Sequence, residues 1–239
     1  MSRHLVVVSA GLGQPSSTRL LADRLAAATG RVLESRGEDV TVDVVELRGL
    51  AHDLANALLT GFPAGDLRAA VERVERADGV VAVTPTFNAS YSGLFKSFFD
   101  VLEPGALTGK PVLLGATGGT ARHSLVLDHA MRPLFAHLQS LVVPTAVYAA
   151  SEDWASGGTA GDPLGERIDR AATQLASLVL QQPPVQAPDP YADAPSFESL
   201  LTGGRSPRAV GYFSVTRWCM PMNACGMPVL SSATKHSIT

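Results

Sequence analysis

Short apolar runs alternate with longer segments of helical period from residue 4 to residue 181. Five runs consist almost entirely of Val, Leu and Ala with few interruptions, and they occupy residues 4–10, 40–47, 79–85, 110–117 and 141–149. Such runs are typical of strands that are buried on both faces of a parallel sheet. The segments that carry apolar residues at helical spacing are 16–37, 66–78, 92–103, 124–139 and 165–181. We therefore predict an α/β fold in which helices cover both faces of a five-stranded parallel sheet.

Right-handed crossovers between five parallel strands fit the sheet order 2-1-3-4-5 of a flavodoxin-like three-layer sandwich. In such sheets, ligands bind beyond the carboxyl ends of the strands. The loops after the first, third and fourth strands are therefore where a functional site is expected.

Composition narrows the class of partner. The chain has 239 residues, of which 46% are hydrophobic, and this is ample for a core. Its net charge of -3 argues against nucleic-acid binding, which needs a concentrated basic face. The apolar run before Gly11 is short for a signal peptide, and no run approaches the roughly 18 apolar residues of a membrane span. We expect a cytoplasmic protein that binds small molecules.

The composition changes after about residue 182. We predict a flavodoxin-like domain over residues 1–182, followed over 183–239 by a Pro-rich linker and an irregular basic tail. Both cysteines, Cys219 and Cys225, lie in this tail, so the domain has no thiol for catalysis or metal binding. We interpret them as reduced thiols, with a soft-metal or redox element as the alternative. The tail also leaves open a role as an interaction module.

The first loop, in SAGLGQPSSTRLL, is rich in groups that bind anions. Gly11 and Gly13 allow close approach to the backbone, and Pro15 restricts the turn just before a helix whose first N–H groups have no partners. No acidic residue occurs between residues 9 and 22. The loop therefore predicts a phosphate site. The hydroxyl donors are Ser9, Ser16, Ser17 and Thr18.

Two other interpretations of this loop remain. Ser16 or Ser17 could simply cap the helix, which explains one hydroxyl. Gly11, Gly13 and Ser16 also give a G-x-G-x-x-S pattern for a dinucleotide site, but the next strand ends at Glu46, too far along for the ribose-binding acid.

The other two loops suit a flat ring. In TPTFNASYSGLFKSFFD, Pro85 gives a rigid turn, Phe87 an aromatic face and Asn88 an amide at the carboxyl end of a strand. In GATGGTARHS, Gly118 and Gly119 let the backbone press against a ring. Either segment alone is also compatible with an ordinary turn.

Together, these loops resemble those of the NADPH-dependent FMN reductase family, and particularly of the reductases that serve luciferase-like or alkanesulfonate-type monooxygenases. The resemblance covers about residues 4–201 and is carried by SAGLGQPSSTRLL, VAVTPTFNASYSGLFKSFFD and the segment from GATGGTARHS to VVPTAVYA. It implies three groups of FMN-binding residues. Those near the phosphate are Ser9, Gly11, Ser16, Ser17 and Thr18; those lining the ribityl chain and ring are Pro85, Thr86, Phe87 and Asn88; those along the ring edge are Thr117, Gly118 and Gly119.

The resemblance also implies an activity. NADPH or NADH would transfer a hydride to FMN, and the reduced flavin would leave for an FMNH2-dependent monooxygenase. A homodimer or homotetramer is implied as well. Many relatives have an arginine inside the first loop, where this chain has Leu12, Gly13 and Gln14, so Arg19 is the candidate to compensate.

Two side chains are candidates for a catalytic role, although hydride transfer to a flavin strictly requires none. Arg122 is a candidate cation for the flavin or the nucleotide phosphate, and its alternative is a solvated arginine in a first turn. His129 lies where similar reductases have a π-type turn. His123, His129 and His137 lack the spacing of helical metal ligands, so no metal site is predicted.

Two alternative functions stay open. A quinone, azo or chromate reductase would use the same loops but keep FMN tightly bound. A flavodoxin-type electron carrier would not oxidise NAD(P)H and would need a strongly acidic surface. Residues 204–239 contain four cationic and no acidic residues, so the preceding residues carry a net charge of -7. This charge is modest for such a surface.

Overall fold

The computed structural model describes residues 2–154 and 162–185 of the chain. One compact unit, Met1–Pro188, contains all of them. The proposed linker and tail, residues 183–239, lie outside the described residues apart from 183–185, and so do both cysteines.

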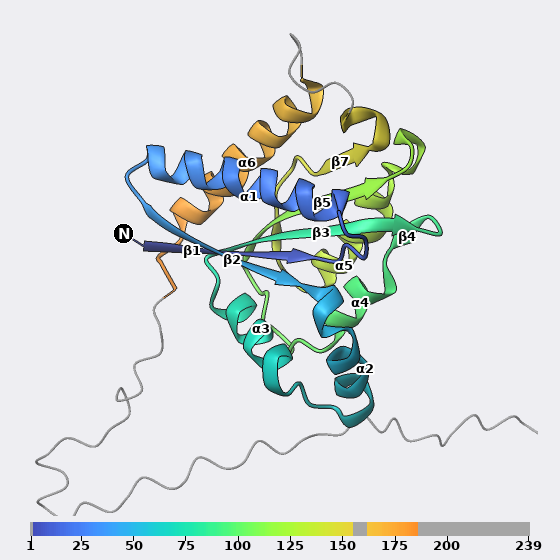
Figure 1. Ribbon diagram of the computed structural model, residues 1–239. Helices are drawn as coiled ribbons and strands as arrows, with labels where there is room; N and C mark the ends of the chain where they lie inside the picture. Colours follow the sequence, from blue (N-terminus) through green and yellow to red (C-terminus); the bar gives the residue numbers. More distant parts are fainter. Residues whose placement is uncertain (1, 155–161, 186–239) are drawn as a thin grey trace, which may run out of the picture. The chain divides into compact units, whose positions relative to one another are not determined.

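The fold is α/β, with a sheet whose long strands are all parallel (Figure 1). The strand order is β2-β1-β3-β5-β6, with β7 also paired to β5 and β4 paired antiparallel to β3. The prediction of exactly five strands is therefore wrong, because the described sheet has seven. The strands are β1 (Ser2–Ser9), β2 (Asp39–Glu46), β3 (Gly79–Phe87), β4 (Ser90–Tyr91), β5 (Pro111–Gly118), β6 (Leu141–Val142) and β7 (Val147–Ala150).

The predicted fifth strand is divided because Pro144 lies in its middle and has no N–H group for the ladder. β6 and β7 pair with opposite ends of β5. Side chains satisfy the backbone between them. The guanidinium of Arg132 donates to the carbonyl oxygens of Val143 and Pro144, and the N–H of Thr145 donates to Gln174 Oε1 at 2.8 Å.

β4 forms a hairpin with β3 that projects from the end of the sheet (Figure 1). Phe87 pairs with Ser90, and the two residues between them, Asn88 and Ala89, have φ values of 47° and 65°. Two positive φ angles are the signature of a type I′ turn. Asn tolerates this conformation, whereas an Ala side chain is strained there.

We expect Ala89→Gly to stabilise the protein by about 1 kcal/mol, because glycine adopts a positive φ without the clash of a Cβ. Ala69→Gly, in the exposed part of a helix, is the matched control and should destabilise by about 1 kcal/mol. Urea unfolding measures both changes. Equal losses in the two variants would contradict the strained turn.

Helices cover both faces of the sheet (Figure 1). The first face carries α1 (Ser17–Ser35) and α6 (Pro163–Gln181), which pack against each other and over one core cluster. The other face carries α2 (Ala51–Thr60), α3 (Gly65–Arg76), α4 (Gly93–Asp100) and α5 (Arg132–His137), with the second cluster. The predicted helices did not include α2 or the single helical turn η1 (Leu47–Leu50) that precedes it.

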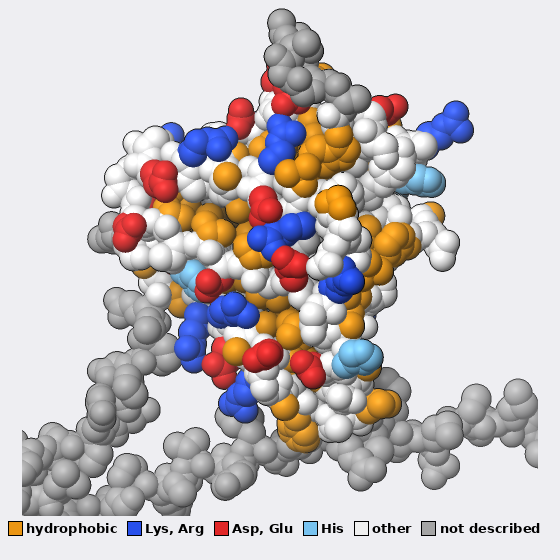
Figure 2. All heavy atoms as spheres, viewed as in Figure 1, with side chains coloured by type: hydrophobic (Ala, Val, Ile, Leu, Met, Phe, Trp, Pro, Cys, Tyr) orange, Lys and Arg blue, Asp and Glu red, His pale blue; other side chains and the backbone are white. Residues whose placement is uncertain are grey.

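Charged side chains of both signs are interspersed over the face shown in Figure 2, with apolar patches between them. Among residues 2–154 and 162–185, no helix combines the length and apolar character needed to cross a membrane.

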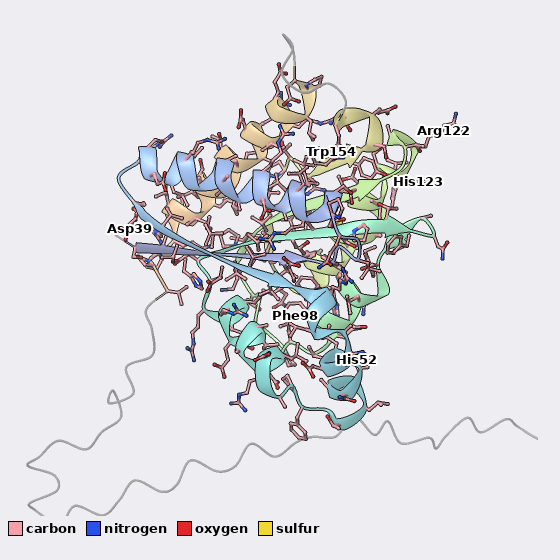
Figure 3. The ribbon with its side chains drawn as sticks, in the orientation of Figure 1. Asp39, His52, Phe98, Arg122, His123 and Trp154 are labelled. Atoms are coloured by element: carbon pink, nitrogen blue, oxygen red, sulfur yellow. The ribbon has the colours of Figure 1, made fainter. Side chains whose placement is uncertain are left out.

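The phenylalanines at helical spacing in α4 are core residues. Phe95, Phe98 and Phe99 are essentially buried, and Figure 3 shows Phe98 among the helices of the second face. Phe99 lies 4.7 Å from Phe95 and 4.9 Å from Phe135 between ring centroids. This aromatic cluster packs α4 against α5.

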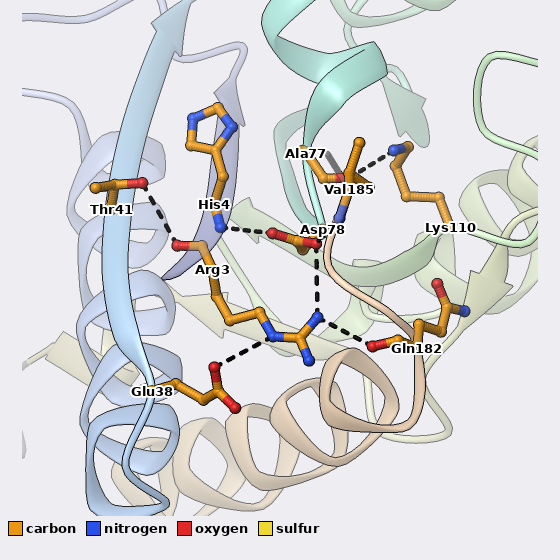
Figure 4. Close-up of polar contacts among 9 residues, drawn as sticks. All are labelled: Arg3, His4, Glu38, Thr41, Ala77, Asp78, Lys110, Gln182 and Val185. Carbon is orange, nitrogen blue, oxygen red and sulfur yellow. Dashed lines mark hydrogen bonds and ion pairs between the residues drawn. The ribbon is translucent and has the colours of Figure 1, made fainter. Parts of the chain in front are cut away.

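A buried polar network lies at the amino ends of the parallel strands (Figure 4). Asp78 Oδ2 accepts from the N–H of His4 at 2.7 Å, and its Oδ1 accepts from the N–H of Val185 at 2.8 Å. Arg3, only 4% exposed, lies 3.6 Å from Asp78 and donates to the carbonyl oxygen of Gln182 at 3.0 Å. The network fixes residues 182–185 at the edge of the sheet opposite the carboxyl ends of the strands.

Two further charges complete this network. Glu38 forms an ion pair with Arg3 at 3.5 Å. Lys110 Nζ donates to the carbonyl oxygens of Glu75 and Ala77 at 3.1 and 2.5 Å. Burial lowers the pKa of Lys110, and the carboxylates of Asp78 and Glu75 oppose that change.

Candidate functional site

The three predicted loops meet in one pocket of about 310 Å³ at the carboxyl ends of β1, β3 and β5. Nine of the twelve residues expected to bind a ligand line it. They are Ser16, Ser17, Thr18, Pro85, Thr86, Phe87, Thr117, Gly118 and Gly119. The other lining residues are Leu12, Gly13, Pro15 and Ser151.

Three of the expected residues lie beside the pocket rather than in its lining. Ser9 is the last residue of β1 and is 2% exposed. Gly11 lies so close to Ser16 that an added Cβ would be 2.1 Å from Ser16 Oγ. Asn88 is at the tip of the β3–β4 hairpin. Gly11 therefore allows the loop to fold back on the start of α1.

Ser16 caps α1, which was one of the two alternative interpretations of the loop. Its Oγ accepts from the N–H of Arg19 at 3.2 Å. Ser17 is exposed at the first position of the helix, and Thr18 follows it. The N–H groups of a first helical turn have no partners within the helix and carry partial positive charge. The cap therefore accounts for one hydroxyl, and the N–H groups of the helix end suit an anion in the pocket.

A hydrogen bond joins the first and third loops. Thr18 Oγ1 and Thr117 Oγ1 are 2.8 Å apart and both residues are buried. The bond links residues 99 positions apart in the sequence, so it holds the start of α1 against the end of β5. This link ties the start of α1 to the strand that leads into Gly118 and Gly119.

Within the described residues, no charged side chain lines the pocket. Arg19, the candidate to replace a loop arginine, is instead held by ion pairs with Asp23 and Glu46. Its guanidinium is therefore already neutralised. The groups that this lining offers to an anion are hydroxyl and backbone N–H groups.

The structure separates both catalytic candidates from the pocket lining. Arg122 lies on the exposed turn η2 (Ala121–His123), and Figure 3 shows its side chain extending outward from the molecule. His129 lies in η3 (Leu127–Met131), which is a π-helical turn as expected for similar reductases. His129 lines a different groove, together with Pro133 and Leu134 of α5.

That groove is larger, at about 770 Å³, but its chemistry is less specific. It lies beside η3, α5 and the end of α4, and its wall mixes Tyr91, Phe99 and Leu134 with charged residues of both signs such as Lys96 and Glu103. In the described part of the chain, no three His, Cys, Asp or Glu residues are arranged to hold a metal ion.

The sequence reading missed Ser151, which lines the pocket directly after β7. The sequence contains a signal for Ser151, because the last predicted strand of the parallel sheet also has its carboxyl end on the side where ligands bind. The prediction also missed Tyr148 of β7, whose hydroxyl donates to the carbonyl oxygen of Thr120 at 3.0 Å. Burial raises the pKa of the Tyr148 phenol, and the nearby Thr86 hydroxyl opposes that rise.

The geometry suits a ligand with an anionic end and a flat body. The hydroxyl and N–H groups at the start of α1 suit a phosphate. The same pocket is lined by the backbone of Gly118 and Gly119 and by the apolar side chains of Pro85 and Phe87, which suit a planar ring.

The sequence is similar to those of known flavin reductases. The sequence model of the family described as NADPH-dependent FMN reductase matches residues 4–155. An FMN reductase (NADPH) of Pseudomonas aeruginosa is 38% identical over 174 residues, covering 73% of this chain and 91% of that protein. The NADH-dependent FMN reductase SfnF of Pseudomonas fluorescens is 38% identical over 180 residues, covering 74% and 94%.

Solved structures are similar as well. An oxidoreductase from Corynebacterium diphtheriae is 47% identical, with a TM-score of 0.73, over 76% of this chain and 99% of that one. The apo form of the NADH:FMN oxidoreductase EmoB is 28% identical, with a TM-score of 0.66, over 80% and 100%.

Proposed function

This chain belongs to the NADPH-dependent FMN reductase family, and from that premise we propose that FMN binds in the pocket where its three loops meet. The protein is an NAD(P)H-dependent oxidoreductase that acts on FMN. The observation that carries the proposed site is the convergence, in one uncharged pocket, of a helix N-terminus, a hydroxyl-rich loop and two glycines.

The phosphate of FMN is proposed to bind at the start of α1. The hydroxyl groups of Ser17 and Thr18 and the first N–H groups of the helix supply hydrogen bonds, and the helix dipole supplies positive potential. The absence of a carboxylate from the described lining supports this assignment, since a carboxylate would repel the phosphate.

The flavin ring is proposed to lie between the hairpin residues Pro85 and Phe87 and the backbone at Gly118 and Gly119. An added Cβ at Gly119 would meet nothing within 4 Å, so the structure leaves open space beside this residue. Bound FMN supplies the redox chemistry by accepting a hydride from the nicotinamide. The protein orients the ring and directs N–H groups toward the edge where negative charge develops.

We infer that the reduced flavin passes to a separate FMNH2-dependent monooxygenase, and that the protein forms a homodimer or homotetramer. Leu12 and Phe87, at the rim of the pocket, are 46% and 47% exposed. Apolar side chains at the mouth of a flavin site fit a second protein surface that covers the ring. Light scattering of the purified protein measures its oligomeric state.

The activity is tested by following the oxidation of NADPH and NADH with and without added FMN. We expect oxidation that depends on free FMN and saturates with it. Absence of flavin-dependent oxidation of either nucleotide would contradict the assignment of the pocket. Turnover of a quinone by protein that retains its flavin through purification would favour the tightly bound reductase instead, and flavin binding without nucleotide oxidation would favour the electron carrier.

A further inference from the structure

Tyr148 lies behind the pocket, where the second and third loops come together. The residue is 6% exposed, and it pairs with Ala116 in the neighbouring strand β5. The phenol extends along the sheet to the end of β5, where its hydroxyl donates to the carbonyl oxygen of Thr120 at 3.0 Å. Tyr148 therefore holds the backbone just beyond the ring-edge glycines.

The phenol also touches Gly118 directly. A Cβ built on Gly118 would lie 2.0 Å from Tyr148 Oη and 3.1 Å from Tyr148 Cζ. Neither distance is compatible with a real side chain, so the tyrosine leaves room for glycine alone. The position of the Gly118 backbone is consequently set by the phenol behind it.

Thr86 of β3 brings the second loop into the same cluster. The same Cβ on Gly118 would lie 3.6 Å from Thr86 Cβ. Thr86 Oγ1 is buried and has no partner of normal hydrogen-bond geometry among the described residues, although it lies near enough to the Tyr148 hydroxyl to influence it. One phenol thus contacts the two loops that would enclose a ring.

The protonated phenol is the form that this arrangement needs. Only a protonated hydroxyl donates to the Thr120 carbonyl. Burial disfavours the phenolate and raises the pKa of Tyr148, so the hydroxyl stays protonated around neutral pH. The contact therefore does not change over the range in which the enzyme would work.

We propose that Tyr148 is a positioning residue for the flavin ring, because its phenol fixes the Gly118–Thr120 backbone and sets the gap between that backbone and Thr86. This inference rests on the proposed function of the pocket. Tyr148 is absent from the residues that line the pocket, so it acts through Gly118 and Thr120 rather than by touching the flavin. The Thr18–Thr117 bond holds the phosphate end, and Tyr148 holds the ring end.

The first test is Tyr148→Phe, which removes the hydroxyl and keeps the ring. Loss of one buried hydrogen bond should raise the Kd for FMN by roughly 5-fold to 10-fold. The KM for FMN should rise in parallel while the KM for NADPH stays within about 2-fold. The binding of riboflavin, which lacks the phosphate, should be weakened by the same factor, because the substitution acts at the ring end of the pocket.

The second test is a double-mutant cycle. Gly118→Ala alone should weaken FMN binding by roughly 20-fold or more, since its Cβ must displace the phenol. In the Tyr148→Phe background the contact at 2.0 Å is gone and the one at 3.1 Å remains. Adding Gly118→Ala there should therefore cost no more than about 3-fold. Gly30→Ala, at a helical site with nothing within 4 Å, is the control for the glycine change and should leave FMN binding unchanged.

The outcomes separate the two claims. Wild-type protein that fails to bind FMN would overturn the proposed pocket and this inference with it. Wild-type binding with an unchanged Kd in Tyr148→Phe would overturn only the positioning role, as would single effects that multiply in the double variant. If Gly118→Ala does not fold, the Kd and KM values of Tyr148→Phe decide the question alone.

Discussion

Replacing Ser17 with Asp should weaken FMN binding by at least about 100-fold without destabilising the protein. Ser17 is exposed at the first position of α1 and lines the pocket. A carboxylate there would face the phosphate of FMN, and two like charges about 4 Å apart repel by about 4 kcal/mol near a protein surface. The same carboxylate interacts favourably with the helix dipole, so the free energy of unfolding should stay level or rise by up to about 1 kcal/mol.

Opposite effects on binding and stability make this variant informative. Isothermal titration with FMN measures the affinity, and urea unfolding measures the stability. Ser17→Ala is the matched control and should weaken FMN binding by only about 5-fold to 10-fold, because it removes one hydrogen bond and adds no charge. Riboflavin should bind the Asp variant as it binds wild type. A comparable loss for riboflavin would show that the phosphate lies elsewhere.

Asp78→Ala should lower the free energy of unfolding by about 3 kcal/mol or more. The carboxylate is buried and accepts hydrogen bonds from the N–H groups of His4 and Val185 (Figure 4). Its removal leaves those donors unsatisfied and deprives the buried guanidinium of Arg3 of one of its two carboxylate partners. Two unsatisfied buried donors and a weakened buried ion pair cost more free energy than the loss of an exposed ion pair.

Asp169→Ala is the control for this change. Asp169 also pairs with an arginine, Arg31, at 3.7 Å, but both side chains are mostly exposed. Its loss should change the free energy of unfolding by no more than about 0.5 kcal/mol. Urea unfolding of both variants compares a buried with an exposed ion pair, and similar losses in the two would refute the structural role of the network at the amino edge.

The sheet could be predicted because its central strands must be buried on both faces. β1, β3 and β5 are runs of Val, Leu and Ala flanked by segments of helical period, and this pattern has few other solutions. The division of the fifth strand was also visible in principle, since Pro144 interrupts LVVPTAVYA. The hydrogen bond from Arg132 to the backbone at this break could not be predicted, because it depends on how a helix packs against the sheet.

The pocket residues could be predicted for a related reason. Loops that follow parallel strands emerge on one edge, so hydroxyls and glycines distant in sequence are brought together. The pocket lining does not include the longer side chains that the sequence suggested as candidates. Arg19 could reach the phosphate loop, but Glu46, 27 residues away, pairs with it instead. His129 was placed correctly in a π-helical turn, but that turn lies against the second groove.

Tyr148 illustrates what sequence patterns alone do not reveal. In an apolar strand a tyrosine is most simply interpreted as a core residue, and its hydroxyl partner is 28 residues earlier. Only the packed sheet shows that its phenol reaches Gly118 and Thr120.

A crystal structure of the protein with FMN tests the central claim most directly. We predict the phosphate within hydrogen-bond distance of the backbone N–H groups of Ser17 and Thr18, and the ring between Phe87 and the Gly118–Gly119 backbone. FMN seated in the groove beside His129, with the pocket at the start of α1 empty, would contradict it.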